Sequence, residues 1–245
     1  ILPTKIYYMN SLYSYRKEKT AAVIYSIILV ISSTYDFIPQ NIISYMQNTT
    51  NNFEIILILN PCPENIKSNI IAFFETHSKQ FHNLIQIKIF QNNTSSSEIY
   101  CSNFAYKESS SKFLLQIQPN ITIKQKSYNY HLSKPLDLLH NVIAVSANNS
   151  NCICPNNINT FHVYETCKTG IILIDKNKLI ELGYLQEPSS HLHISLHHLL
   201  TSAYSSKQYI SGYISIYFDS PLDHYSVYTD VKKKISLIIY YIIII

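Results

Sequence analysis

The chain has 245 residues, of which 47% are hydrophobic and only 14% are charged, and its formal net charge is +4. This length allows one large domain, and the hydrophobic content is ample for its core. The small, dispersed charge argues against a nucleic-acid-binding protein, since the only basic run is Lys232-Lys233-Lys234.

Hydrophobic periodicity predicts strands that alternate with helices in the first part of the chain. Residues 23–31 are an almost continuous β-branched and apolar run, which is typical of a parallel strand buried on both faces. Residues 37–46 have apolar side chains at helical spacing, and 66–74 predict a second helix. Strands are predicted at 53–59 and 84–90. This β-α-β-α-β order predicts a parallel sheet with right-handed crossovers.

The next predicted strand, 113–118, ends abruptly in the polar sequence Gln118-Pro119-Asn120. The carboxyl end of a central strand is where α/β proteins place ligand chemistry. Gln118 and Asn120 have the shape of an acid-x-acid pair without its charge. Further strands are predicted at 141–146, 170–175 and 213–218.

This strand end resembles the Asp-x-Asp signature by which inverting family-two glycosyltransferases hold a divalent metal and a sugar-nucleotide diphosphate. Three more segments are similar to that family in order and spacing. Residues 44–56 match its "SLLxQTYxNFEII" segment without gaps, 92–112 match a helix whose asparagine falls on Asn103, and 170–184 match the segment before its catalytic acids. The resemblance covers roughly 23–220. It implies an α/β, GT-A-like fold with a mixed, mainly parallel sheet and helices on both faces.

The resemblance divides the chain into three parts. Residues 1–22 are an N-terminal extension, 23–220 the glycosyltransferase-like domain, and 221–245 a C-terminal extension with an apolar tail. The tail at 235–245 is shorter than the about 20 apolar residues of a spanning helix. We therefore expect membrane contact only if the apolar run continues, and otherwise a strand or helix that packs on a neighbour.

The resemblance places six residues in the nucleotide-sugar cleft: Ser32, Leu59, Asn60, Asn103, Gln118 and Asn120. Asn103 matches the family's asparagine, and the other five depart from the family's chemistry. An inverting transferase needs a base for the acceptor hydroxyl and cations for the leaving diphosphate. Hard cations prefer anionic oxygens, so neutral amides suit them poorly. We expect a degenerate cleft without a metal cofactor, with Mn²⁺ or Mg²⁺ only if the chain is an active transferase.

Histidines stand where the family has its catalytic acids. His191 falls near the position of the general base and is the candidate base of a rebuilt site. If this stretch is helical, His193 and His197 lie at i and i+4 on one face, a spacing that can ligate zinc. His224 falls where the family often has a late metal- or phosphate-contacting histidine. The competing interpretation is partly exposed residues that hold no metal.

The sequence leaves open whether three of the cysteines bind zinc, form a disulfide or are free thiols. Cys152 and Cys154 are separated by one residue, and Cys167 follows alone. A zinc site would favour a wider spacing and a second pair. A disulfide from Cys167 to one of the other two, or free thiols, are the alternatives.

These observations predict a pseudo-glycosyltransferase that acts as a structural or interaction module, with other protein subunits or domains as partners. The 21 tyrosines suit an interface, although drift in an AT-rich genome would also enrich them. The alternative is an active, metal-independent hexosyltransferase that uses a nucleotide-sugar donor. The compartment cannot be read from the residues.

Overall fold

The computed structural model describes residues 9–17, 22–32, 39–94, 96–149, 160–167, 170–186 and 191–220. The strands of its main sheet are β1 (Met9–Arg16), β2 (Tyr25–Ser32), β3 (Phe53–Asn60), β4 (Leu84–Asn92), β5 (Phe113–Ile117), β7 (Val142–Asn149), β8 (His162–Tyr164), β9 (Ile171–Asp175) and β10 (Ile210–Ile216). A small second sheet pairs β6 (Thr122–Ile123) with β11 (Phe218–Asp219). The α-helices are α1 (Pro39–Asn48), α2 (Glu64–His77), α3 (Glu98–Glu108), α4 (Tyr128–Leu138), α5 (Lys176–Glu181) and α6 (Leu192–Ser205), and a 3₁₀ turn, Ser78–Gln80, follows α2.

The main sheet is mixed and mainly parallel, as the sequence predicted. Its strand order is β1-β4-β3-β2-β5-β9-β7-β10-β8. β2 pairs in parallel with β3 and β5, and β3 pairs in parallel with β4. β9 lies between β5 and β7 and runs antiparallel to both. All strands predicted between residues 23 and 218 are present, with ends that differ by a few residues.

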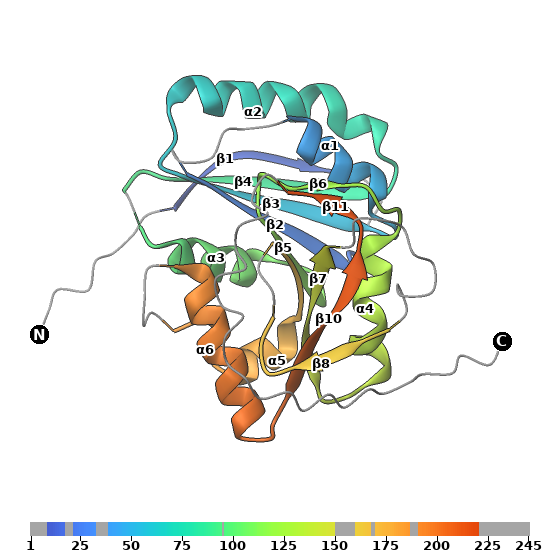
Figure 1. The fold of residues 1–245 in the computed structure, drawn as a ribbon. Coiled ribbons are helices and arrows are strands. Elements are labelled where there is room, and N and C mark those ends of the chain that lie inside the picture. Colours follow the sequence, from blue (N-terminus) through green and yellow to red (C-terminus); the bar gives the residue numbers. More distant parts are fainter. Residues whose placement is uncertain are drawn as a thin grey trace, which may run out of the picture.

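Helices cover both faces of the sheet, and this prediction is also confirmed (Figure 1). The apolar side chains of β2 and β3 alternate between two buried clusters, because successive residues of a strand point to opposite faces. Ile27 and Ile55 pack with side chains of α1, α2 and α4. Ile28 and Ile56 pack on the other face with side chains of α3, α5 and α6.

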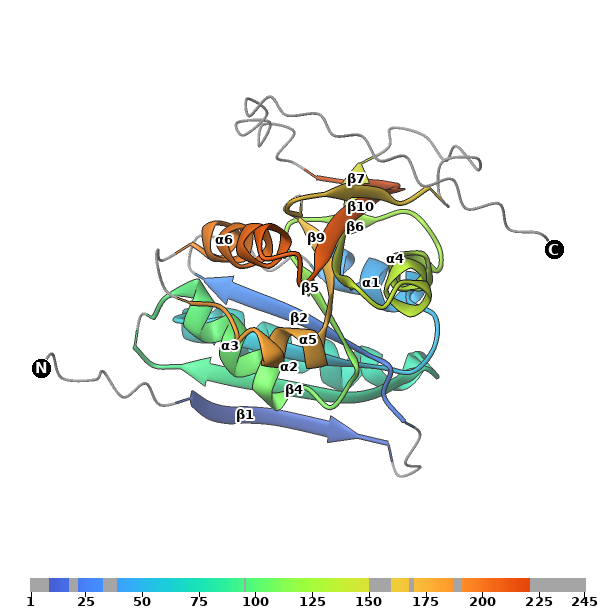
Figure 2. The ribbon, with the colours of Figure 1, turned by 90° about the horizontal axis from the view of Figure 1, so that it is seen from below.

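The segment before residue 23 contributes to this sheet. β1 pairs antiparallel with β4 over Met9 to Arg16 and forms an outer edge beside it (Figure 2). Lys17 continues the pairing, because its backbone N–H donates to the carbonyl of Ile85 at 3.0 Å. The N-terminal extension therefore supplies an edge strand of the domain.

Two regions named by the sequence analysis lie outside the described residues. They are the loop with Cys152 and Cys154, and the C-terminal extension with His224. Within the described part of the chain, no helix is long and apolar enough to cross a membrane.

Candidate functional site

Five of the six predicted cleft residues lie at the carboxyl ends of neighbouring strands, and the sixth, Asn103, lies on α3. β2, β3 and β5 are parallel neighbours, so their carboxyl ends at Ser32, Asn60 and Ile117 point the same way. Gln118 and Asn120 follow β5 directly. The strand ends predicted from the sequence therefore lie at the edge where open α/β sheets bind ligands, and their role in binding stays a prediction.

The segment after β5, residues 118–123, which includes β6, is hydrogen-bonded to polar side chains of α1. Asn41 donates to the carbonyl of Pro119 at 2.9 Å and accepts from the Thr122 hydroxyl at 2.6 Å. Ser44 Oγ accepts the backbone N–H of Ile123 at 3.0 Å. These contacts fix the backbone that carries Gln118 and Asn120.

Tyr45 is the centre of this attachment. Its ring is fully buried, and its hydroxyl donates to the carbonyl of Ile121 at 2.7 Å. The carbonyls of Gln118 and Pro119 lie 3.2 and 3.3 Å from the same oxygen. Burial raises the pKa of Tyr45 well above its usual value, so the hydroxyl stays a donor. The sequence analysis missed this residue, although it lies among the apolar positions of the predicted helix.

Tyr45→Phe should lower the free energy of unfolding by about 1–3 kcal/mol, because the buried carbonyl of Ile121 loses its hydroxyl donor. Urea denaturation of the full chain measures this change. Tyr130→Phe is the control: Tyr130 is 48% exposed, so its change should stay within about 0.5 kcal/mol. Equal effects of the two substitutions would contradict the role given to Tyr45.

Gln118 and Asn120, which stand where the family has its metal-binding Asp-x-Asp pair, differ in their surroundings. Gln118 is half-buried, and its backbone N–H donates to the carbonyl of Gly170 at 2.9 Å. Asn120 is also half-buried, but its Oδ1 is enclosed and has no hydrogen-bond partner among the described residues. An enclosed acceptor of this kind is costly unless something donates to it.

Asn60 is held by the turn after β4. Its Nδ2 donates to the carbonyl of Ser96 at 2.9 Å. Its Oδ1 accepts from Asn92 Nδ2 at 3.0 Å and from the backbone N–H of Ser96 at 3.3 Å. Both ends of the amide are thus used inside the protein. Leu59, the residue before it, is fully buried in the core.

Asn103 lies on α3 and is hydrogen-bonded to the segment after α5. Its Nδ2 donates to the carbonyl of Leu185 at 2.8 Å, and its Oδ1 accepts the N–H of the same residue at 3.2 Å. The Asn103 amide therefore links α3 to the segment after α5. Ser32, at the end of β2, is half-buried.

The histidine stretch begins α6, with His191 at the N-cap and exposed. The Glu98 carboxylate, from the first turn of α3, accepts the backbone N–H of Leu192 at 3.3 Å. Burial raises the pKa of Glu98, while this N–H and the nearby His191 act to lower it. The sequence analysis did not single out Glu98, because nothing in the chain order signals its closeness to α6.

The other histidines make different contacts. The ring centroid of His193 lies 5.7 Å from that of His191, and burial lowers the pKa of His193. His197 is exposed, and its Nδ1 lies 3.1 Å from the hydroxyl of Thr166. Among the described residues, no group of three or more His, Cys, Asp or Glu side chains is arranged to hold a metal. Cys167 is a free thiol, and burial raises its pKa to about 12.

Comparison of the fold with solved structures finds glycosyltransferases. The mannosyltransferase PcManGT from Pyrobaculum calidifontis, in complex with GDP-Man and Mn²⁺, matches with a TM-score of 0.61 at 12% identity, over 80% of this chain and 57% of that one. TarS from S. aureus matches with a TM-score of 0.56 at 14% identity, over 79% of this chain and 58% of that one. GalNAc-T7, with UDP, GalNAc and Mn²⁺, matches with a TM-score of 0.55 at 9% identity, over 82% of this chain and 46% of that one.

These matches show that the chain has the GT-A fold of nucleotide-sugar transferases. It spans little more than half the length of the first of these proteins and less than half of the last. No protein-family model matches the sequence, and no curated protein sequence does.

Proposed function

We propose that this GT-A-fold chain is a pseudo-glycosyltransferase, a non-catalytic domain that works as a structural or interaction module. The observation that carries the proposal is the hydrogen bonding of Asn60. Its position corresponds to the strand end that contacts the base in family-two transferases, but its Nδ2 bonds to Ser96 and its Oδ1 accepts from Asn92 and Ser96. A buried side chain whose nitrogen and oxygen both hold the turn after β4 is poorly placed to contact a nucleotide.

The donors at the metal-pair position support the same proposal. Both PcManGT and GalNAc-T7 were solved with Mn²⁺. Here the corresponding side chains are Gln118 and Asn120, each of which offers one neutral carbonyl oxygen. The enclosed Oδ1 of Asn120 is a single acceptor, whereas a hard cation that bridges a diphosphate needs several anionic oxygens. These residues therefore do not fit Mn²⁺ or Mg²⁺.

Exposed aromatic side chains support protein subunits or domains as partners. Tyr164 on β8 is 44% exposed, and its ring meets that of Tyr213 edge-on, with 6.5 Å between the centroids. The Tyr213 ring also stacks on His162 at 4.9 Å. Aromatic residues of this kind are enriched at the centres of protein interfaces.

Calorimetry with UDP- and GDP-sugars in the presence of Mn²⁺ should detect no saturable binding in the micromolar range. The reason is that Asn60, at the position that would contact the nucleotide base, is bonded within the turn after β4. Gln118 and Asn120, at the position of the metal pair, carry no negative charge. PcManGT with GDP-Man and Mn²⁺ is the positive control for the conditions. Micromolar, Mn²⁺-dependent binding that Asn120→Ala abolishes would contradict the proposal.

A metal-independent transferase is the second candidate, because the Glu98 carboxylate bonds to the N–H of Leu192, the residue after His191, and the nearby His191 acts to lower the pKa of Glu98. A carboxylate can orient an imidazole that accepts a hydroxyl proton. If this candidate is correct, sugar transfer or donor hydrolysis proceeds in EDTA, and His191→Gln and Glu98→Gln each remove it. Absence of turnover in the unsubstituted chain, tested with both UDP- and GDP-sugars, would reject the candidate.

A further inference from the structure

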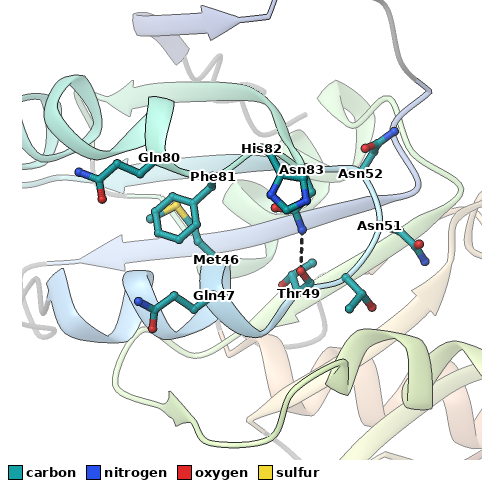
Figure 3. Close-up of a pocket in the computed structure, with 10 residues that line it drawn as sticks. Met46, Gln47, Thr49, Asn51, Asn52, Gln80, Phe81, His82 and Asn83 are labelled. Carbon is teal, nitrogen blue, oxygen red and sulfur yellow. Dashed lines mark hydrogen bonds between the residues drawn. The ribbon is translucent and has the colours of Figure 1, made fainter.

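A hollow with a mixed polar and apolar lining lies at the opposite edge of the sheet from the candidate cleft. Its volume is about 530 Å³, and it is lined by residues of the α1–β3 turn and of the segment before β4 (Figure 3). Both segments precede parallel strands, whereas Asn60 and Gln118 follow them. A ligand in this hollow therefore leaves the candidate cleft untouched.

The lining is rich in amides and contains no Asp, Glu, Lys or Arg among its ten residues. Gln47 and Gln80 are exposed at the hollow, and Asn52 and Asn83 are half-buried in it. An amide offers both donors and acceptors, so it pairs with hydroxyl groups in either role. These ten residues carry no ammonium, guanidinium or carboxylate group, and the nearby Lys17 ammonium is already bonded to the carbonyls of Phe81 and His82, so the lining favours an uncharged ligand over a phosphate or a carboxylate.

The side-chain amides of Asn52 and Asn83 are each held by one hydrogen bond from the amide nitrogen. Asn83 Nδ2 donates to the carbonyl of Thr49 at 2.6 Å, and Asn52 Nδ2 donates to the carbonyl of Ala22 at 3.2 Å. Within the described part of the chain, neither Oδ1 has a recorded donor, and neither atom is enclosed. Both carbonyl oxygens are thus fixed acceptors, and fixed groups lose little entropy when a ligand binds.

The hollow also has an aromatic wall. Phe81 is half-buried and packs on the core cluster that contains Met46, and Figure 3 draws the two residues together. Lys17 holds this segment by donating to the carbonyls of Phe81 and His82 at 3.0 and 2.7 Å. An aromatic face carries partial negative charge, and the C–H groups of a pyranose face are weakly positive.

We propose that this hollow is a binding site for a neutral carbohydrate, with Phe81 against one sugar face and the amides of Gln47, Gln80, Asn52 and Asn83 on its hydroxyls. A neutral sugar matches the lining in three respects: it is uncharged, it is dense in hydroxyls, and it has an apolar face. The proposal does not rest on the activity or inactivity of the other edge of the sheet.

The test is ligand-observed NMR and calorimetry on the full chain, with maltose, mannobiose and chitobiose as probes and UMP as a charged comparison. We expect saturable binding of at least one disaccharide and none of UMP. The double variant Q47A/Q80A and the variant Phe81→Leu should each weaken the affinity about tenfold, since each removes part of the contact surface. Gln208→Ala, on an exposed glutamine after α6, should leave it unchanged.

Three results would overturn the proposal: no saturable sugar binding, sugar binding that the hollow variants leave unchanged, or UMP binding that they abolish. Thermal melting of each variant separates a lost site from a lost fold. Gln47 and Gln80 are exposed, so Q47A/Q80A should melt like the unsubstituted chain and remain a valid test even if Phe81→Leu is destabilised.

Discussion

Glu54→Ala should lower the free energy of unfolding by about 3–5 kcal/mol, because it breaks a buried hydrogen-bond network in which several donors share one charged acceptor. Glu54 lies on β3 and is completely buried. Its Oε1 accepts from the Ser26 hydroxyl at 2.5 Å, from the Ser110 N–H at 2.6 Å and from the Ser110 hydroxyl at 2.9 Å. Its Oε2 lies 3.2 Å from the Lys88 ammonium.

This carboxylate joins three parts of the fold: β2, β4 and the turn between α3 and β5. Its removal takes this acceptor from the Ser26 hydroxyl and from the N–H and hydroxyl of Ser110, while the Lys88 ammonium keeps a hydrogen bond to the carbonyl of Glu108 at 2.5 Å. Glu54→Gln keeps the shape and some of the hydrogen bonds, so it should cost less than Glu54→Ala.

Urea denaturation monitored by circular dichroism measures both changes. Glu64→Ala is the matched control, because its carboxylate also pairs with a lysine, Lys67 at 2.9 Å, but the Glu64 side chain is 81% exposed. The control should change stability by less than about 0.5 kcal/mol. A loss for Glu54→Ala no larger than that of the control would show that the buried network is not a major source of stability.

Gly212→Ala should destabilise the domain by at least about 3 kcal/mol, at the upper end of what overpacking costs. Gly212 lies on β10 between β7 and β8. A Cβ at this position would lie 2.1 Å from the carbonyl oxygen of His162 and 2.7 Å from the ring of Phe161. The first neighbour is backbone, so the clash is relieved only if the two strands separate.

Thermal unfolding compares Gly212→Ala with Ser215→Ala, a half-buried residue on the same strand. Ser215→Ala should change the stability by less than about 1 kcal/mol. We also expect Gly212→Ala to expose the Cys167 thiol to alkylation, because Cys167 Sγ donates to the carbonyl of Gly212 at 3.6 Å. A folded Gly212→Ala variant with unchanged melting temperature would mean that β8 does not pack on β10 as described.

The sequence by itself determined the parallel centre of the sheet and the edge that holds the candidate cleft. The runs at 23–31 and 53–59 are apolar at nearly every position and rich in β-branched residues, as is typical of parallel strands covered on both faces. Strand direction then places the carboxyl ends together, so Asn60 and Gln118 could be assigned to one edge without coordinates.

The tertiary structure alone decided what the residues at that edge do. An amide can contact a ligand or close a turn, and sequence spacing does not distinguish the two. Asn60 is bonded to Ser96, and Asn103 to Leu185, across 36 and 82 residues of chain. The antiparallel direction of β9 and the joining of β1 to β4 were likewise set by pairing between distant segments. A hydrogen-bond partner that the chain brings back from so far away leaves no local signal, because periodicity and turn chemistry report only on neighbouring residues.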